Sequence, residues 1–501
     1  MQVEVLIVGA GPVGTMLAGE LRLAGITTMV VDRLERPSPH SRAFRMQSRS
    51  LELLDQRGLL DEFRAQGKPW SKAHFAGLQP LLELGALPSP YPFALAIPQT
   101  RTEAILEAHA VRRGAEIRRG RDLVALTEHD DALTAVLTGP DGSREEVTAS
   151  FVVGCDGGGS TVRKLAGIPF PGTEPAVSAL LGDVRLADPG QLPSGVPGTL
   201  RTPRGLLMAV SLEEGVTRIL TTRFTGRPDP DEEVTLDHLR SVVREIVGAE
   251  VNFDSPRWLS RFTDTTRLAA HYRAGRVLLA GDAAHVHFPI GAQGLNLGLQ
   301  DAVNLGWKLA ATIRGTAAAG LLDTYEAERR PAAERVLRET RAQLALMNPD
   351  ERISPLRELI GELLELPPVN LFLAGLLTGI DARTPRETDD HPLIGGRAAP
   401  LEIQRPDGRP VTVAELLRGG RGVLLDLADR ADLRAVAAGW SAVVDLAPVR
   451  SAGKVDADAV LVRPDGHVAW AAPVGAEVSS LSEVLGRWFG SPHALERTPE
   501  E

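Results

Sequence analysis

Residues 3–33 read VEVLIVGAGPVGTMLAGELRLAGITTMVVDR, and this stretch decides the fold of the first part of the chain. Val3–Val8 and the later run TTMVVDR are rich in Val, Ile and Leu, which is typical of strands buried on both faces of a parallel sheet. The segment between them spaces Leu17 and Leu21 on one face of a helix, and Gly25 is expected to end that helix. We therefore expect a strand–turn–helix–strand unit.

The turn of this unit reads Gly9-Ala10-Gly11-Pro12-Val13-Gly14. Glycines at these positions allow a tight turn, close approach of the backbone to a pyrophosphate, and close packing of helix on strand. The helix behind the turn presents free N–H groups and about half a positive charge to phosphates. Asp32 ends the second strand, where an acid hydrogen-bonds a ribose hydroxyl. The unit predicts a dinucleotide with an unphosphorylated adenosine ribose, FAD or NAD; the alternative is a turn that binds nothing.

Two later stretches repeat the order of strand, glycine turn and helix. Residues 154–168 read GCDGGGSTVRKLAGI, with Asp156 at the end of a strand. Residues 281–301 read GDAAHVHFPIGAQGLNLGLQD, with Asp282 at a strand end and Gly294 close to a helix start. Taken alone, both are ordinary strand–turn–helix connections, so their meaning depends on the first motif.

The composition limits the class of protein. A length of 501 residues exceeds what one core usually organises, so roughly two to four domains are expected. The chain is 43% hydrophobic and 24% charged, as in globular proteins, and its net charge of −10 argues against nucleic acid as a partner. Cys155 is the single cysteine, which excludes an internal disulfide and favours a reducing cytoplasm. No basic leader and no bilayer-spanning apolar run is seen, so no membrane association is expected.

Two histidines in the third motif, His285 and His287, raise the question of a metal site. A metal needs further ligands at suitable geometry, and none is evident, so no metal is expected. We expect His285 to fix the turn by hydrogen bonding and His287 to line a pocket. Cys155 ends a buried strand and is expected to be a packing residue.

The remaining segments suggest further domains. Residues 49–67, RSLELLDQRGLLDEFRAQG, predict one helix. Short alternating segments at about 171–266 predict an antiparallel sheet inserted into the nucleotide domain. Long helices follow to about residue 377, and after a linker residues 401–490 carry an α/β alternation of their own.

The three motifs, in this order and at these separations, resemble the class A flavin-dependent monooxygenases of the para-hydroxybenzoate hydroxylase fold. The resemblance covers nearly the whole chain and includes LAGELRLAG, SLELLDQRGLL, GAEIRRGRDLVAL and QDAVNLGWKL. It is nearest to hydroxylases that tailor aromatic polyketides in bacterial antibiotic pathways, with rifampicin monooxygenases as near relatives. The implied fold class is α/β: a Rossmann-type FAD-binding domain, an inserted antiparallel-sheet substrate domain and a C-terminal thioredoxin-like domain.

The resemblance also implies domain boundaries. The FAD-binding domain with its following helices would comprise residues 1–72, 99–170 and 267–390, the substrate-binding domain 73–98 and 171–266, and the thioredoxin-like domain 391–495. The last of these contains no cysteine, so it cannot perform dithiol chemistry. We expect it to be structural or an assembly surface.

A set of cofactor contacts carries over by position. The residues placed on FAD, from the pyrophosphate and adenosine to the ribityl chain and isoalloxazine ring, are Gly9, Gly11, Val13, Gly14, Asp32, Arg33, Leu123, Arg42, Gln99, Asp282, Gly294, Leu295 and Asn296. Asp156 would also touch a transiently bound NADPH. Two departures stand out: Gly159 replaces an arginine common in relatives, and Ala292 replaces a second glycine. A methyl at residue 292 need not block binding if its backbone angles suit alanine.

The implied reaction reduces FAD with NAD(P)H, NADPH being favoured, and then uses O2 through a flavin C4a-hydroperoxide. Pro289 and Gly291 would lie beside the C4a carbon, and the helix start at Leu295 would direct its positive end toward the reduced ring. A phenolic substrate attacks better as phenolate, so a nearby cation should help. Arg45 is our candidate for that cation, the alternative being a solvated arginine. His74 is a weaker candidate and is expected to be a core or rim histidine.

The function implied is hydroxylation of a phenolic, polycyclic aromatic polyketide in antibiotic biosynthesis. One alternative is Baeyer–Villiger insertion or epoxidation by the same kind of enzyme on a related polyketide or drug. An alternative of another class is a flavoprotein reductase, or a ligand-binding flavoprotein, that makes no oxygenated product. The substrate pocket is expected between residues 68–98 and the inserted sheet, and to be large and apolar. The expected partners are this small molecule and O2, with the chain a monomer or homodimer.

Overall fold

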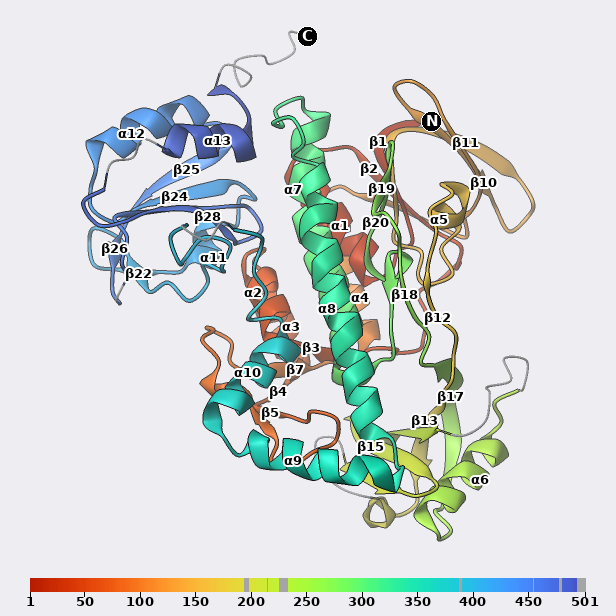
Figure 1. Cartoon of the computed structure of the whole chain (residues 1–501). Coiled ribbons are helices and arrows are strands. Elements are labelled where there is room, and N and C mark those ends of the chain that lie inside the picture. The colour runs from red at the N-terminus through yellow and green to blue at the C-terminus, as the bar shows by residue number, and fades with distance from the viewer. Residues whose placement is uncertain are drawn as a thin grey trace.

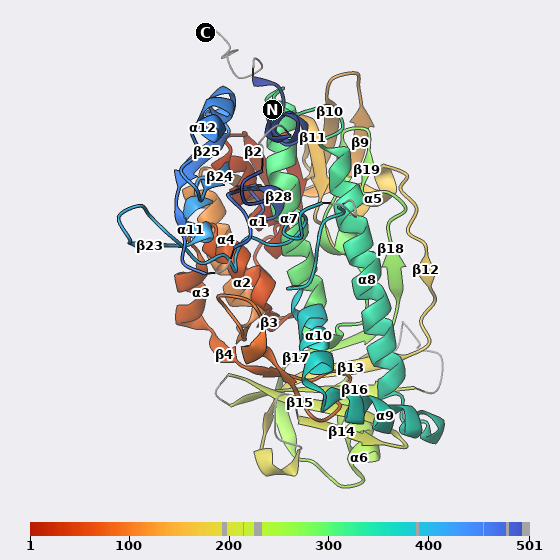
Figure 2. The same cartoon turned by 60° about the vertical axis from the view of Figure 1, so that its left-hand side comes forward.

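The computed structural model describes residues 1–192, 198–213, 215–224, 233–386, 390–453, 455–476 and 480–492. In Figures 1 and 2 the N-terminal sheet and the C-terminal part lie near one end of the molecule, and a second sheet lies at the other end. The long helix α8 (Asp323–Met347) runs between the two ends. The overall α/β fold class is confirmed.

The unit predicted at the N-terminus is present. β1 (Gln2–Val8), α1 (Pro12–Leu23) and β2 (Thr28–Asp32) follow in that order, and β1 pairs in parallel with β2. The central residues of both strands are fully buried, as expected for strands covered on both faces. Gly25 takes a φ of 75° just beyond α1, a left-handed conformation that glycine adopts easily and that ends the helix.

Within the described residues this unit is the centre of an eight-stranded sheet, in the order β19-β20-β11-β1-β2-β8 with β10 and β9 added beside β11. β1, β2, β11 and β20 are parallel, so the glycine turns that follow β1, β11 and β20 meet at one edge of the sheet. The added strands are β8 (Glu116–Arg119), β9 (Asp122–Glu128), β10 (Leu133–Thr138), β11 (Arg144–Gly154), β19 (Arg273–Ala274) and β20 (Val277–Leu279).

The single helix predicted over residues 49–67 is wrong. Two helices, α2 (Ser48–Asp55) and α3 (Leu60–Gln66), replace it. Gly58 takes a φ of 69° between them, so the chain turns there although the apolar periodicity continues. α4 (Gln99–Arg112) and α5 (Thr161–Leu165) complete the helices of this part.

The predicted antiparallel sheet is also present. Its described strands run β14-β15-β16-β13-β17, and each neighbouring pair is antiparallel. α6 (Leu236–Val247) packs its buried Leu239 and Val243 against this sheet. The strands are β13 (Ser178–Leu186), β14 (Gly198–Thr202), β15 (Gly205–Glu213), β16 (Val216–Arg223) and β17 (Phe253–Thr263).

The other described strands of residues 45–286 are short and form smaller sheets. β3 and β4 both pair with β7, β5 pairs with β6, and β18 pairs with β12 and β21. Their bounds are β3 (Arg45–Met46), β4 (Lys68–Trp70), β5 (Lys72–Ala73), β6 (Leu82–Glu83), β7 (Ala94–Ala96), β12 (Gly172–Thr173), β18 (Thr266–Leu268) and β21 (His285–Val286). Single turns of 3-10 helix are η1 (Leu84–Ala86), η2 (Pro189–Gln191), η3 (Gly281–Ala283), η4 (Ile290–Ala292) and η5 (Glu351–Ile353).

α7 (Gln293–Ile313), α8, α9 (Ser354–Leu364) and α10 (Pro367–Thr378) follow the third motif. α7 packs on α1 and α8. Among the described residues no single helix has the length and apolar composition needed to cross a membrane. The helical segments 351–364 and 367–378 have that length and composition only when they are taken together, and the two are bent by 103° relative to each other.

The C-terminal part forms its own mixed sheet, in the order β25-β24-β27-β28. β24 and β25 are parallel, and the other two pairs are antiparallel. Its elements are β22 (Ile403–Gln404), β23 (Pro410–Val411), α11 (Val413–Leu416), β24 (Gly422–Asp426), α12 (Ala431–Ala437), η6 (Ala438–Trp440), β25 (Val444–Pro448), β26 (Arg450–Ser451), β27 (Ala459–Val462), β28 (Val468–Ala472) and α13 (Leu481–Phe489).

Candidate functional site

The first glycine turn lies where β1 ends and α1 begins. A Cβ atom at Gly9 would lie 2.3 Å from the carbonyl oxygen of Cys155, and one at Gly14 would lie 2.0 Å from that of Gly9. A Cβ at Gly11 would meet no described atom within 4 Å, so this position is open. Gly11 is also the N-cap of α1, and it has no side chain to occupy the first N–H groups. The turn is therefore a cradle that can take a pyrophosphate.

Asp32 lies beside this cradle at the end of β2. Its Oδ2 accepts a hydrogen bond from the Ala10 N–H at 2.8 Å, and its Oδ1 accepts one from the Leu34 N–H at 2.8 Å. The carboxylate is half-buried, and each oxygen keeps a lone pair for a ligand hydroxyl. Arg33 is exposed next to it. This geometry suits a ribose bound at the end of β2.

Three other residues of the predicted cofactor set lie on separate elements. Gln99 begins α4, and its Oε1 accepts a hydrogen bond from the Ala43 N–H at 2.8 Å, which holds the neighbouring Arg42 beside α4. The Arg42 side chain is exposed. Leu123 is 2% exposed and packs in the main core, so a ligand could meet its backbone but not its side chain.

The third motif meets the first at the edge of the sheet. A Cβ at Gly281 would lie 2.9 Å from Cγ2 of Val13, so the two turns are in close contact. Asp282 is exposed, and its Oδ1 lies 3.9 Å from the place of a Cβ at Gly294. The Asp282 carboxylate therefore lies beside the first turn of α7, where it can accept hydrogen bonds from ligand hydroxyls.

The start of α7 is bound to β3 through Asn296 and Gln47. Asn296 Oδ1 accepts a hydrogen bond from the Gln47 N–H at 2.7 Å, and its Nδ2 donates to the carbonyl oxygen of Arg45 at 3.0 Å. Gln47 Nε2 donates to the carbonyl oxygen of Gly291 at 2.8 Å. These bonds bring the strand that carries Arg45 against the loop that carries Gly291, and they engage the Asn296 side chain within the protein.

The backbone before α7 is left-handed at two successive residues. Gly291 has a φ of 73°, and Ala292 has φ 55° and ψ 42°. The condition that the backbone at Ala292 suits alanine is therefore not met, since this region costs an L side chain about 1–2 kcal/mol. Pro289 is exposed and Leu295 is half-buried beside this turn. With Ala292 as N-cap, α7 also begins without a side-chain cap from any described residue.

Arg45 is buried on β3, so the alternative of a solvated arginine is wrong. It is 8% exposed, and its guanidinium carbon lies 5.1 Å from the centroid of the Trp70 ring. Burial lowers the pKa of Arg45 to about 10, which leaves the side chain cationic at neutral pH. Its Nε has no hydrogen-bond partner among the described residues. Arg45 is thus a buried cation with a donor to spare.

His74 is a core histidine, as expected. Burial lowers the pKa of His74 to about 3, and the positive charge of Arg45 adds to the shift. Its Nδ1 accepts a hydrogen bond from the Gly77 N–H at 3.1 Å, so the ring is neutral with its proton on Nε2. A neutral, hydrogen-bonded ring here does not supply a second cation.

His74 should make the protein acid-sensitive. An unfolded histidine has a pKa near 6.5, so between about pH 6.5 and 3 the unfolded state binds more protons than the folded state. The free energy of unfolding therefore decreases as the pH is lowered through this range, by up to about 1.4 kcal/mol per pH unit. His74→Asn keeps an acceptor for Gly77 but does not titrate, so urea unfolding between pH 6.5 and 4.5 should show a shallower loss. His129→Asn, at an exposed site, should keep the parent slope. Equal slopes in all three proteins would contradict the assignment.

In the second motif, the side chain of Asp156 hydrogen-bonds to residues at the start of the helix that follows it. Asp156 Oδ1 accepts a hydrogen bond from Ser160 Oγ at 2.6 Å, and its Oδ2 accepts from the Thr161 N–H at 2.6 Å. The Asp156 carboxylate thus stabilises the start of α5. Gly159 is exposed, and a Cβ there would meet no described atom within 4 Å, so this position has room for a long side chain.

The histidines of the third motif make hydrogen bonds. His285 Nε2 bonds Asp301 Oδ2 at 2.7 Å, which confirms the expected role of His285 in fixing the turn. His287 is half-buried and its Nδ1 contacts the carbonyl oxygen of Phe288 at 2.8 Å. In the described part of the chain no group of three or more His, Cys, Asp or Glu could hold a metal. Cys155 packs against the core beside Gly14, as expected.

An apolar cluster connects the five-stranded sheet to the third motif. Phe288 and Ile290 are buried in it together with Leu206 of β15, and Phe262 lies 5.2 Å from Phe288 between ring centroids. A cavity of about 300 Å³ lies among α7, α8, α10 and residues 381–385. No residue of the five-stranded sheet lines that cavity, so it is distinct from the expected substrate pocket.

Several residues that organise the site were not identified from the sequence. Gln47 holds Gly291, Asp301 holds His285, and Arg218 donates to the carbonyl oxygen of Arg42 at 3.2 Å. In the sequence, Gln47 lies two residues after Arg45, and Asp301 is the acid of QDAVNLGWKL, so both polar residues lie in stretches that the sequence had already marked. Their partners, however, are distant in the chain, so neither role could be assigned.

The fold and the site define an α/β protein with a dinucleotide cradle, a ribose-binding acid and a second helix start at the same sheet edge. The chain matches the family model "FAD binding domain" over residues 2–340 and the model "Aromatic-ring hydroxylase, C-terminal" over residues 391–492. It belongs to the FAD-dependent aromatic-ring hydroxylase family and is a monooxygenase that binds FAD, as the resemblance indicated.

Relatives and solved structures agree with this family. The chain is 45% identical over 509 residues to 12-dehydrotetracycline 5-monooxygenase/anhydrotetracycline 6-monooxygenase of Streptomyces rimosus, covering 98% of this chain and 100% of that protein. It is 43% identical over 492 residues to rifampicin monooxygenase of Streptomyces venezuelae, covering 98% and 99%. The structure of the anhydrotetracycline hydroxylase OxyS from Streptomyces rimosus superposes with a TM-score of 0.92 at 45% identity, covering 98% and 100%.

Proposed function

We propose that this enzyme hydroxylates a polycyclic, phenolic aromatic polyketide with NAD(P)H and O2, as a step of antibiotic biosynthesis. The observation that carries this proposal is the apolar cluster that runs from the five-stranded sheet to Phe288 and Ile290, together with the buried cation Arg45 on β3, whose partner strand β7 contributes Ala94 to the cluster. An apolar region beside a buried cation suits a large aromatic phenol. The relatives named as monooxygenases of tetracycline precursors and of rifampicin support the same substrate class.

FAD would take up reducing equivalents from NAD(P)H and use O2 to supply an electrophilic oxygen. The turn Gly9–Gly14 with the α1 N-terminus would hold its pyrophosphate, Asp32 would hold the ribose, and Asp282 would hold the ribityl chain. The free N–H groups at the start of α7, near Leu295, would stabilise negative charge on the ring. Arg45 stabilises the phenolate of the substrate, and the Pro289–Gly291 turn shapes the pocket from which the apolar cluster excludes water.

We propose NADPH as the favoured, transiently bound reductant. Gly159 weakens its recognition, because a glycine supplies no positive charge at this position. Gly159→Arg would restore a charge at a position that has open space. An exposed ion pair contributes about 0.2–1 kcal/mol, so the KM for NADPH should fall by up to about fivefold while kcat changes little. Gly159→Gln adds length without charge and should leave the KM unchanged. An equal fall in both variants would mean that charge is not the cause.

The same proposal covers the domains and their setting. Residues 1–72, 99–170 and 267–390 would form the FAD-binding domain, 73–98 and 171–266 the substrate domain, and 391–495 a thioredoxin-like domain. For the last, the support is its order of a parallel βαβ pair, an antiparallel hairpin and a helix. We place the enzyme in the cytoplasm, where NADPH is made, as a monomer or homodimer.

The proposed reaction is tested with anhydrotetracycline, rifampicin and a panel of anthracycline and angucycline intermediates. We expect at least one polycyclic phenol to stimulate NADPH oxidation and to gain one oxygen atom from 18O2. NMR of the product distinguishes hydroxylation from Baeyer–Villiger insertion or epoxidation, which leave the product with the same added mass. Stoichiometric hydrogen peroxide and no 18O in any product would favour a non-oxygenating flavoprotein instead.

A further inference from the structure

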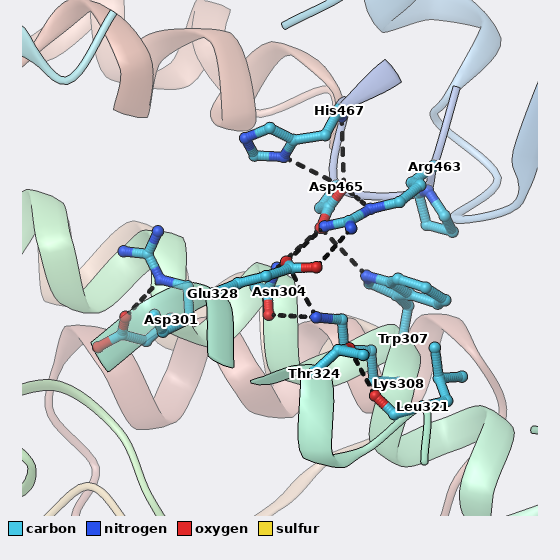
Figure 3. Close-up of polar contacts among 12 residues, drawn as sticks. Asp301, Asn304, Trp307, Lys308, Leu321, Thr324, Glu328, Arg463, Asp465 and His467 are labelled. Carbon is cyan, nitrogen blue, oxygen red and sulfur yellow. Dashed lines mark hydrogen bonds and ion pairs between the residues drawn. The ribbon is translucent and has the colours of Figure 1, made fainter. Parts of the chain in front are cut away.

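A cluster of buried charges joins the C-terminal part to α7 and α8, and Figure 3 shows it between their ribbons. We call it the interdomain charge cluster: Asn304 and Lys308 of α7, Glu328 of α8, and Arg463 and Asp465 of the turn between β27 and β28. Arg463 donates from Nη1 and Nη2 to the two Glu328 oxygens at 2.6 and 2.8 Å. Lys308 Nζ lies 3.0 Å from Glu328 Oε2. Asn304 Nδ2 donates to Asp465 Oδ2 at 2.9 Å.

The interdomain charge cluster is nearly free of solvent. Each of its members is at most 9% exposed. Burial acts to raise the pKa of Glu328, but Arg463 and Lys308 together hold that pKa below its usual value, so the carboxylate is ionised. Such a buried ion pair adds little stability over an apolar contact, whereas it fixes one relative position of the groups it joins. Its geometry therefore specifies how the C-terminal part is docked on α8.

The next residue of α8 continues the connection toward the third motif. Arg329 Nε donates to Asp301 Oδ1 at 2.8 Å. Asp301 Oδ2 in turn accepts from His285 Nε2 at 2.7 Å and from the Gly281 N–H at 3.2 Å. Arg329, Asp301 and His285 are all at most 5% exposed. Gly281 immediately precedes Asp282, so these bonds hold the backbone from which the Asp282 carboxylate extends.

We propose that the C-terminal domain positions the flavin loop, residues 281–287, through α8. Arg463 fixes Glu328, the adjacent Arg329 fixes Asp301, and Asp301 fixes the backbone before Asp282. Arg463 and Asp301 are thus positioning residues that act on FAD without touching it. The proposal rests on the placement of FAD at Asp282 given above.

The test is a double-mutant cycle on FAD affinity, measured by flavin fluorescence as apoprotein is titrated with FAD. Asp301→Asn should raise the Kd for FAD about 2- to 30-fold, the range for residues along a coupled path, and Arg463→Lys should raise it by less. In the double variant the Kd for FAD should rise by clearly less than the product of the two single-variant factors, because both changes loosen the same loop. Independent effects at separated sites would multiply instead and would overturn the proposal.

A second variant and a control distinguish an effect on the flavin loop from a general loss of stability. If Arg463→Lys does not fold, Asn304→Ala takes its place in the cycle, since it removes a neutral member of the cluster. Val460→Ala weakens the fully buried core of the C-terminal domain without touching the cluster, and should leave the Kd within twofold. The midpoint potential and visible spectrum of bound flavin should shift in Asp301→Asn and Arg463→Lys but not in Val460→Ala. A shift of equal size in Val460→Ala would overturn the proposal.

The same assay separates this proposal from the proposed reaction. FAD affinity is measured without substrate or NADPH, so an enzyme that hydroxylates no polyketide can still show the predicted cycle. Asp282→Ala should raise the Kd at least as much as Asp301→Asn. An unchanged Kd in Asp282→Ala would show that FAD does not lie at this loop, and would overturn the proposal at its base.

Discussion

Arg57→Met should lower the free energy of unfolding by about 3–5 kcal/mol, the usual result of removing one partner of a buried ion pair. Arg57 is 4% exposed, and its Nε and Nη2 donate to the two oxygens of Glu20 at 2.6 and 2.8 Å. Its Nη2 also donates to the carbonyl oxygen of Pro464 at 2.9 Å. Without Arg57 the Glu20 carboxylate, 5% exposed, has lost its counterion. Urea unfolding followed by circular dichroism measures the loss.

A surface ion pair provides the matched control. Arg112 lies 3.0 Å from Glu62, and both side chains are about half exposed, at 53% and 47%. Arg112→Met should therefore cost less than about 1 kcal/mol. The double variant Arg57→Met with Glu20→Met should recover much of the single-variant loss, because it removes the unpaired charge. Similar losses from Arg57→Met and Arg112→Met would refute the assigned role of burial.

Gly11→Ala should leave the fold intact and raise the Kd for FAD about 5- to 150-fold, which corresponds to about 1–3 kcal/mol of overpacking against a bound pyrophosphate. The backbone at Gly11, with φ −76° and ψ −176°, is one that alanine adopts readily. The added methyl meets no described protein atom, so the free energy of unfolding of the apoprotein should not change. Flavin fluorescence and urea unfolding of the same preparation measure both quantities.

Gly14→Ala is the companion variant for this prediction. Its methyl would lie 2.0 Å from the carbonyl oxygen of Gly9, so the apoprotein itself should be destabilised. The two glycines thus separate a role in ligand binding from one in packing. If Gly11→Ala binds FAD with the parent affinity, the pyrophosphate does not lie against this turn.

The features that the sequence predicted correctly are those set by neighbouring residues. The first βαβ unit, the three glycine turns and the antiparallel sheet all follow from local periodicity and from turn residues. The break between α2 and α3 did not, because the apolar spacing continues across Gly58 while its left-handed backbone turns the chain. At Ala292 the left-handed angles are imposed by the loop around Gly291 and Asn296, and an alanine gives no sign of them.

The environments of charged residues could not be predicted in the same way. Arg45 was expected to be a cation near the flavin or a solvated arginine, and only the pairing of β3, β7 and β4 decides that it is buried. Asp301 and Arg463 were not identified at all, since each acts on groups supplied by other parts of the chain. The cofactor contacts named by resemblance remain predictions, although the backbone geometry at Gly9, Gly11 and Gly14 suits them.

The interdomain charge cluster also has a consequence for biosynthesis on the ribosome. Arg463 is synthesised 135 residues after Glu328, the carboxylate that it binds with two hydrogen bonds. While the nascent chain grows, Glu328 lacks this arginine, and only Lys308, Asn304 and water can compensate its charge. The two hydrogen bonds between Arg463 and Glu328 therefore form only after translation has passed residue 463, so the docking of the C-terminal domain on α8 is a late step of folding.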